Sequence, residues 1–307
     1  MPIHDLGLRE LSERPSARFP LSLPIADTGN RIASRSRWLT RLVLYAWLPT
    51  TYFLVAFFAY EQWLQHSDQD QWSFEFLLET MDFPEPIQAE LMNGAAGRAA
   101  IWSFLLSTFL RFQSVVMIIL IGLLAPPLIS RDLKSRAYLI IFSRPVRVLD
   151  YILGKLLILL FYVMIVTVIP ALALYIFGVL LSPDLHALSA TAMLPVKLIG
   201  ATAMIAIAPA TLALCFSALT IESRYASFAW FAVYILGIVA YGALTSTDPT
   251  RDWFFVSLYQ IAIQAQSEIL GVEVASTSGT TACLSLGGIL VVSLFIVWRR
   301  VTSPLRS

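Results

Sequence analysis

The sequence predicts an all-α integral membrane protein with six transmembrane helices, and two properties of the chain support this prediction. Hydrophobic residues make up 58% of the 307 residues and charged residues only 13%, with a mean hydropathy of +0.74. Charged residues reach about 25% in soluble domains. Several apolar stretches attain the roughly 20 residues that a helix needs to cross a hydrocarbon layer about 30 Å thick. They lack the strict polar alternation of barrel strands, so helices are the expected spanning elements.

Residues 1–38 are expected to form a flexible, basic, cytoplasmic tail, because this segment combines six arginines with scattered prolines. It has no apolar run of the kind found in a cleaved signal peptide, so the first span is expected to direct the chain to the membrane. That span is predicted at 39–60. Trp38 and Arg41 flank its start, and both residue types favour a membrane interface.

The loop at 61–100 is strongly acidic, with eight carboxylates against the single basic residue Arg98. We expect it on the outer side as a solvated acidic face rather than a cation site. Pro84 and Pro86 separate two short amphipathic helices in this interpretation, since proline ends one helix and is tolerated at the start of the next.

The second span is predicted at 101–129, with Pro126 and Pro127 closing it at the inner face. Arg111 interrupts it. This arginine lies either near the outer interface or against a protein interior, because exposure to lipid at the bilayer centre costs on the order of 3 kcal/mol. The remaining spans are predicted at 152–181, 194–219 with a bend at Pro209, 226–244 and 281–298.

The segment at 245–280 is predicted to hold a half-inserted outer helix before the sixth span. Its polar residues recur at helical spacing on an otherwise apolar helix, which is typical of a helix that lies in the interface or re-enters partway: Ser257, Gln260, Gln264 and Ser267. Arg299 and Arg300 end the sixth span, and residues 301–307 form a short cytoplasmic tail. The six spans and their loops, residues 39–300, are expected to be one domain.

The distribution of charge orients these spans. With both termini in the cytoplasm, the inner segments contain 17 of the 21 Lys and Arg residues and the outer segments 13 of the 20 Asp and Glu residues. This arrangement obeys the positive-inside rule.

The spans contain few groups that could perform chemistry. The three histidines lie outside them, and no carboxylate is central in any span, which argues against a carrier driven by an ion gradient. Gly154 and Lys155 match the end of a phosphate-binding loop, but Leu149 and Leu156 replace its other required residues. We therefore expect no enzymatic activity, no cofactor in this chain and no nucleic-acid partner.

The inner segment between the second and third spans, Ser130 to Lys155, carries six of the chain's basic residues. Ile129, Leu133, Ala137 and Ile141 share one face of a predicted amphipathic helix on the inner surface. Asp132 and Arg136 are spaced as a stabilising i, i+4 pair, and Pro145 is expected to end the helix near Ser143. Two interpretations remain open at this point: a topology signal that contacts acidic lipids, or a docking site for a soluble partner.

About 35 residues of the chain, LLAPPLISRDLKSRAYLIIFSRPVRVLDYILGKLL, resemble the permease subunits of ABC-2 type ATP-binding-cassette transporters. In that family a small residue and a proline end a span, and an I-x-x-D helix, an S-R-P turn and a D-Y-x-x-G-K start of the next span follow. The corresponding residues here are Ile129 with Asp132, then Ser143, Arg144 and Pro145, then Asp150, Tyr151, Gly154 and Lys155.

The resemblance implies a multi-pass permease of a bacterial inner membrane, with a cytoplasmic coupling helix within residues 128–151. It implies that Arg131, Asp132, Lys134, Arg136 and Tyr138 face an ATPase subunit, that residues 143–145 transmit its motion, and that Asp150, Tyr151, Gly154 and Lys155 lead into the third span. ATP would bind to two copies of that subunit, and a second permease copy or a paralogue would complete a dimer. The rival interpretation is a membrane scaffold that does not transport.

Overall fold

The computed structural model describes residues 22–65, 83–137, 141, 146–183, 186–272 and 279–302. All the regular secondary structure in these residues is helical. Six of the helical segments are long and apolar enough to cross a membrane, which confirms the predicted fold class of a multi-pass helical protein. The six predicted spans are confirmed within a few residues at each end.

The first three spans are each built from consecutive helices. They are Arg37–Gln65, formed by α2 (Arg37–Tyr45) and α3 (Leu48–Gln65); Arg98–Lys134, formed by α6 (Arg98–Leu124) and α7 (Pro126–Lys134); and Val148–Leu181, formed by α9 (Val148–Val163), the π-helical turn η2 (Met164–Val168) and α10 (Ile169–Leu181). The last three are single helices: α12 (Leu194–Leu219), α13 (Ser223–Thr247) and α15 (Gly279–Thr302).

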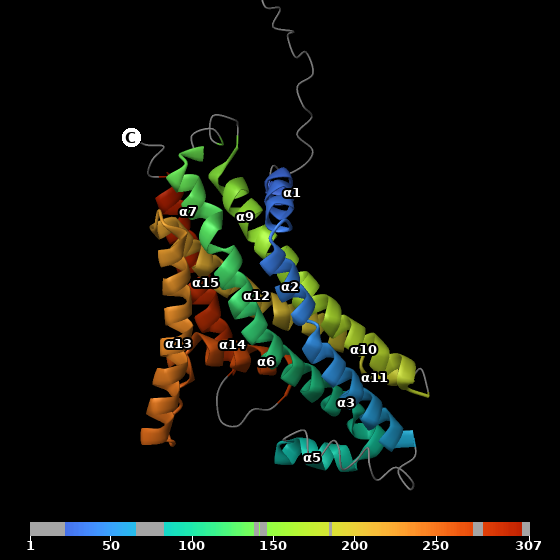
Figure 1. Ribbon diagram of the computed structural model, residues 1–307. Helices are drawn as coiled ribbons and strands as arrows, with labels where there is room; N and C mark the ends of the chain where they lie inside the picture. Colours follow the sequence, from blue (N-terminus) through green and yellow to red (C-terminus); the bar gives the residue numbers. More distant parts are fainter. Residues whose placement is uncertain are drawn as a thin grey trace, which may run out of the picture.

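Short helices connect or flank the spans: α1 (Ser22–Ala33), α5 (Glu85–Met92), η1 (Gly94–Gly97), α11 (His186–Ala190), η3 (Phe254–Val256) and α14 (Leu258–Leu270). Figure 1 shows α1, α7 and the first turns of α9 at one end of the bundle and α5 at the other. We call these the α7 end and the α5 end. The first and last described residues both lie at the α7 end, as an even number of spans requires.

The centre of the bundle is α12, and the most exposed span is α13. Two thirds of the most apolar window of α12 is buried (67%), against only 17% of that window in α13. Toward the α5 end, aromatic side chains fill the space between α3, α6 and α10. The rings of Phe53, Phe57, Trp102, Phe109 and Tyr175 pack edge to face there. α12 continues through Pro209 without a break.

Pro126 and Pro127 do not close the second span, so this prediction is wrong. Only Ala125, itself with helical φ and ψ, separates α6 from α7. The two prolines occupy the first turn of α7, where a helix tolerates a missing N–H. The carbonyl of Gly122, whose normal donor would be the N–H at position 126, instead accepts a hydrogen bond from Ser227 Oγ at 3.3 Å. The helix therefore extends toward the α7 end.

Two further expectations need correction. Glu61 does not belong to a solvated acidic face, because its carboxylate is buried. Arg98 contacts it through Nε and Nη2, each at 3.2 Å, and Trp102 donates to it at 3.1 Å. The acidic residues at 66–82, and the first of the two short helices predicted there, lie outside the described residues. In the N-terminal segment, part of the tail expected to be flexible is helical: α1 (Ser22–Ala33) packs along α9.

The helix predicted before the sixth span is α14, and it packs against α6, α12, α13 and α15. Ser257 and Ser267 of the predicted polar stripe are buried, so the stripe is not a solvated face. Gln266, which is also buried, donates from Nε2 to the Ser107 carbonyl of α6 at 3.1 Å. The depth of α14 in a bilayer stays a prediction.

Candidate coupling site

α7 ends the second span and carries the basic residues that the sequence singled out. Its helix stops at Lys134, and Ser135 is the C-cap. Arg136 follows in a left-handed conformation with φ of 54°, which an arginine adopts only rarely. The predicted continuous helix is therefore interrupted at Ser135 and Arg136, although Ala137 and Ile141 are helical again, and its predicted end near Ser143 lies outside the described residues. The predicted Asp132–Arg136 pair is also wrong, because the chain leaves the helix before a full turn can bring the two side chains together.

Ser217, near the end of α12, inserts its hydroxyl into the backbone of α7. Its Oγ accepts from the N–H groups of Ile129 and Ser130, both at 3.1 Å, and donates to the Pro126 carbonyl at 2.5 Å. A hydroxyl has one donor and two acceptor positions, so all of them are used. Ser217 and Ser130 are fully buried. This side chain fixes α12 to α7 at the point where the prolines weaken the helix.

A second contact joins α7 to α9. The Lys155 ammonium lies 2.7 Å from Asp132 Oδ2, and the Tyr151 hydroxyl donates to the same oxygen at 2.7 Å. The ammonium also lies 5.3 Å from the centre of the Tyr151 ring. The side chains of Lys155 and Asp132 are only 13% and 21% exposed. Three motif residues that are far apart in the sequence thus form one ion-pair cluster.

A third contact joins α7 to the turn between α12 and α13. Lys134 Nζ lies 2.6 Å from Glu222 Oε1. The hydrogen bond and the charge of Lys134 lower the pKa of Glu222 from its usual value of 4.5. A lowered carboxylate pKa means that the pair contributes fully above pH 4.5 and loses its contribution only as the pH falls through the lower, folded-state value. The pair therefore stays ionised across the physiological range.

Gly154 has a different role from the charged members of the motif. It lies in α9 where α1 crosses closely, and a Cβ at this position would come within 2.8 Å of Ile25 Cγ2 and 3.1 Å of the Ser22 carbonyl oxygen. A larger residue would push α1 away from α9. Gly154 thus serves helix packing, and nothing in its surroundings resembles a phosphate cradle.

The remaining predicted site residues divide into three groups. Arg131 and Arg136 have exposed side chains at the α7 end. Asp150 lies in the first turn of α9, where a negative charge stabilises a helix N-terminus. Tyr138, Ser143, Arg144 and Pro145 lie outside the described residues. Among the residues that are described, no cluster of three or more His, Cys, Asp or Glu side chains could hold a metal ion.

Sequence reasoning missed two residues of this site, Ser217 and Glu222. Nothing in the sequence marks Ser217, because a single serine in an apolar helix usually bonds to its own preceding turn. Glu222 offered a signal, since it is an acid in a predicted inner turn opposite a basic segment.

The fold defines a multi-pass helical membrane protein whose second, third and fourth spans are joined at the α7 end. No protein-family model matches the chain, and no curated protein matches it. The functional argument therefore depends on the residues described above.

Proposed function

We propose that this chain is the transmembrane permease subunit of an ABC-2 type exporter, driven by a separate ATPase subunit that binds at the α7 end. In this proposal the α7 end faces the cytoplasm of a bacterial cell, the chain resides in the inner membrane, and ATP is bound only by the two ATPase copies. Energy reaches the spans through α7.

The observation that carries the proposal is the combination of fixed and exposed groups on α7. Ser217, Asp132 and Lys134 connect α7 to α12, α9 and the α12–α13 turn. Arg131 and Arg136 remain exposed. A force applied to these arginines would move three spans together, since packed elements joined by several contacts shift as rigid bodies. A topology signal alone would need no such connections.

The test is charge reversal on the exposed face of α7. With Arg131→Glu and Arg136→Glu combined, we expect the purified chain to fold normally but to lose most of its association with the ATPase and of the coupled ATPase activity. In the proposed complex the two arginines attract an acidic surface of the ATPase, and the two glutamates would repel it. Pull-down of the partner ATPase subunit from the source cells, followed by ATPase assays in proteoliposomes, measures both quantities.

Arg35→Glu is the matched control, because Arg35 is an exposed cation in the α1–α2 turn, away from α7. It should leave assembly and activity unchanged. If the α7 double variant assembles and hydrolyses ATP like the unmodified chain, α7 is not the coupling element, and the scaffold interpretation gains support.

A second copy or a paralogue completes the proposed transporter. Arg111 lies near the middle of α6 with an exposed side chain, close enough to Tyr259 of α14 for an electrostatic interaction. An arginine facing lipid there would cost on the order of 3 kcal/mol. α13, whose Trp230 donates to the Ile118 carbonyl of α6, is mostly uncovered. We infer that another permease chain covers Arg111.

Cysteine cross-linking in membranes tests this inference for a second copy. In a chain whose Cys215 and Cys283 are replaced by alanine, we expect Phe112→Cys to give a covalent dimer with a short bismaleimide, because Phe112 adjoins Arg111 and is 54% exposed. Ile176→Cys on α10, which is 55% exposed, is the control and should stay monomeric. A monomer from Phe112→Cys would argue against a second copy on this face.

A further inference from the structure

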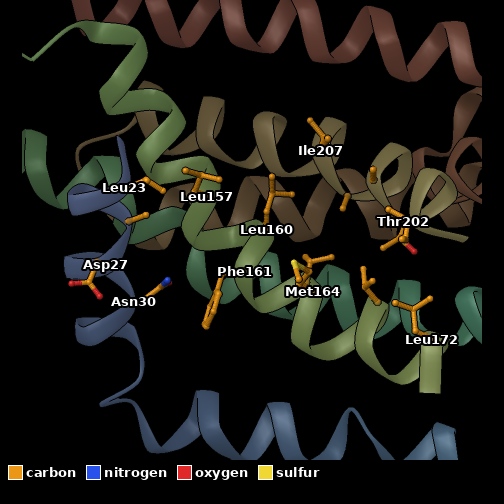
Figure 2. Close-up of a pocket in the computed structure, with 16 residues that line it drawn as sticks. Leu23, Asp27, Asn30, Leu157, Leu160, Phe161, Met164, Leu172, Thr202 and Ile207 are labelled. Carbon is orange, nitrogen blue, oxygen red and sulfur yellow. The ribbon is translucent and has the colours of Figure 1, made fainter. Parts of the chain in front are cut away.

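An apolar groove lies between α1, the α9–α10 span and α12 (Figure 2). Its volume is about 730 Å³, within the range of roughly 300–1,000 Å³ that is typical of small-molecule sites. Leu157, Leu160 and Ile207 are among its apolar lining residues, and Asp27, Asn30 and Thr202 are its polar ones. It lies apart from Asp132, Ser217 and the other contacts of α7.

The groove is elongated and open along its side. Figure 2 shows Asp27 and Asn30 of α1 at one end and Leu172 and Thr202 at the other. From Leu157 to Leu172 the lining span rises roughly 22 Å at 1.5 Å per residue, more than half of a hydrocarbon layer about 30 Å thick. Met164 and Ile199, at the groove's edge, are 54% and 48% exposed. A molecule in the bilayer can therefore enter sideways.

The polar end of the groove has a hydrogen-bond acceptor without a donor. Asn30 Oδ1 is buried, and no described residue bonds to it. A buried acceptor without a donor costs free energy, so this oxygen favours a ligand that brings an N–H group. Beside it, Asp27 and Arg31 form an exposed ion pair at 3.0 Å. A headgroup with both an ammonium and a phosphate complements this end: the ammonium toward Asn30 and Asp27, the phosphate toward Arg31.

We propose that the groove binds one glycerophospholipid with a primary ammonium headgroup, of the phosphatidylethanolamine type, with an acyl chain lying between α9–α10 and α12. The inference does not depend on the proposed transport function. Thr202 Oγ1 at the far end also has no partner among the described residues, but a helical threonine can rotate to bond its own preceding turn. The far end thus needs no polar ligand group.

Native mass spectrometry of the purified full-length chain tests the proposal. The chain is delipidated in detergent and offered equal amounts of phosphatidylethanolamine, phosphatidylcholine and phosphatidylglycerol with identical acyl chains. We expect phosphatidylethanolamine to be retained about tenfold better than phosphatidylcholine, because methylation removes every ammonium donor, and a charge-assisted hydrogen bond accounts for at least this factor. Asn30→Leu should reduce the preference to within about twofold, because the lone acceptor is gone.

Two tryptophan variants separate the groove from ordinary surrounding lipid. Ala203→Trp fills the groove and should abolish retention of the lipid, whereas Ala243→Trp, on the exposed surface of α13, should retain it. Elution as a single species in size-exclusion chromatography checks folding, and Asn30→Leu carries the test if Ala203→Trp does not fold. Equal retention of phosphatidylethanolamine and phosphatidylcholine, or equal effects of the two tryptophan variants, would overturn the proposal. The retained lipid would then be an adventitious additive only, bound like the rest of the surrounding lipid.

The variant Thr202→Val tests whether the ligand places a polar group at the far end of the groove. The variant should retain phosphatidylethanolamine as the unmodified chain does, because only the apolar end of an acyl chain reaches this position. A tenfold loss would show that the ligand places a polar group deep in the groove, and it would overturn the assignment to a phospholipid.

Discussion

Replacing Ser217 with alanine will destabilise the chain by about 2–4 kcal/mol and loosen α7. The alanine leaves the N–H groups of Ile129 and Ser130 without their acceptor, inside a buried junction where neither can reach water. Each buried unpaired group costs about 1–3 kcal/mol. Thermal and denaturant unfolding of the purified chain in detergent measure the effect.

The matched control is Ser114→Ala. Ser114 is also a buried serine in an apolar helix, but its hydroxyl donates only to the Leu110 carbonyl of its own helix. Its loss should cost under about 1 kcal/mol. Hydrogen exchange separates the two roles, because the backbone amides at 128–134 should exchange faster in Ser217→Ala and normally in Ser114→Ala. Equal destabilisation and equal exchange in the two variants would show that Ser217 does not fix α7.

The sequence predicts the spans well because membrane insertion is decided by length and hydropathy, and both are properties of a continuous segment. The boundary at Pro126 failed for a local reason. Proline breaks a helix through its missing N–H and its ring, but Ser227 and Ser217 satisfy the neighbouring backbone groups from other helices. Membrane helices tolerate proline when such partners exist. No pattern within the second span reveals partners that lie 91 and 105 residues further along the chain.

The sequence marks residues of the candidate site, but it does not predict how they contact one another. The motif marked Asp132, Tyr151 and Lys155, and the structure brings these three together. It was expected that Asp132 would contact Arg136, because residues at i and i+4 meet on a regular helix. The left-handed Arg136 ends that regularity. Sequence spacing identifies neighbouring side chains only where a helix is continuous. The contacts of Asp132 on α7 with Tyr151 and Lys155 on α9 are therefore visible only in the three-dimensional structure.

The same site gives the second large effect: Asp132→Asn and Lys155→Met are each expected to cost about 2–3 kcal/mol of unfolding free energy. Breaking a fully buried ion pair costs roughly 3–5 kcal/mol, because one charge stays behind without compensation. The side chains of Asp132 and Lys155 are 21% and 13% exposed, so solvent screening lowers the cost of leaving one charge unpaired. Asp27→Asn is the control, since the Asp27–Arg31 pair is 61% and 77% exposed and should contribute under about 0.5 kcal/mol.

The double variant Asp132→Leu with Lys155→Met distinguishes a structural contact from a coupling contact. Two apolar side chains of similar volume often replace a buried ion pair without loss of stability. The double variant should therefore unfold close to the unmodified chain. In the double-mutant cycle that uses Asp132→Leu and Lys155→Met as its single variants, the coupling energy should then be about 4–6 kcal/mol, the combined cost of the two single substitutions. Costs that simply add would mean that the two residues do not interact. If α7 transmits motion through this pair, the stable double variant will still lose coupled ATPase activity, because the directional attraction between α7 and α9 is gone while the fold remains.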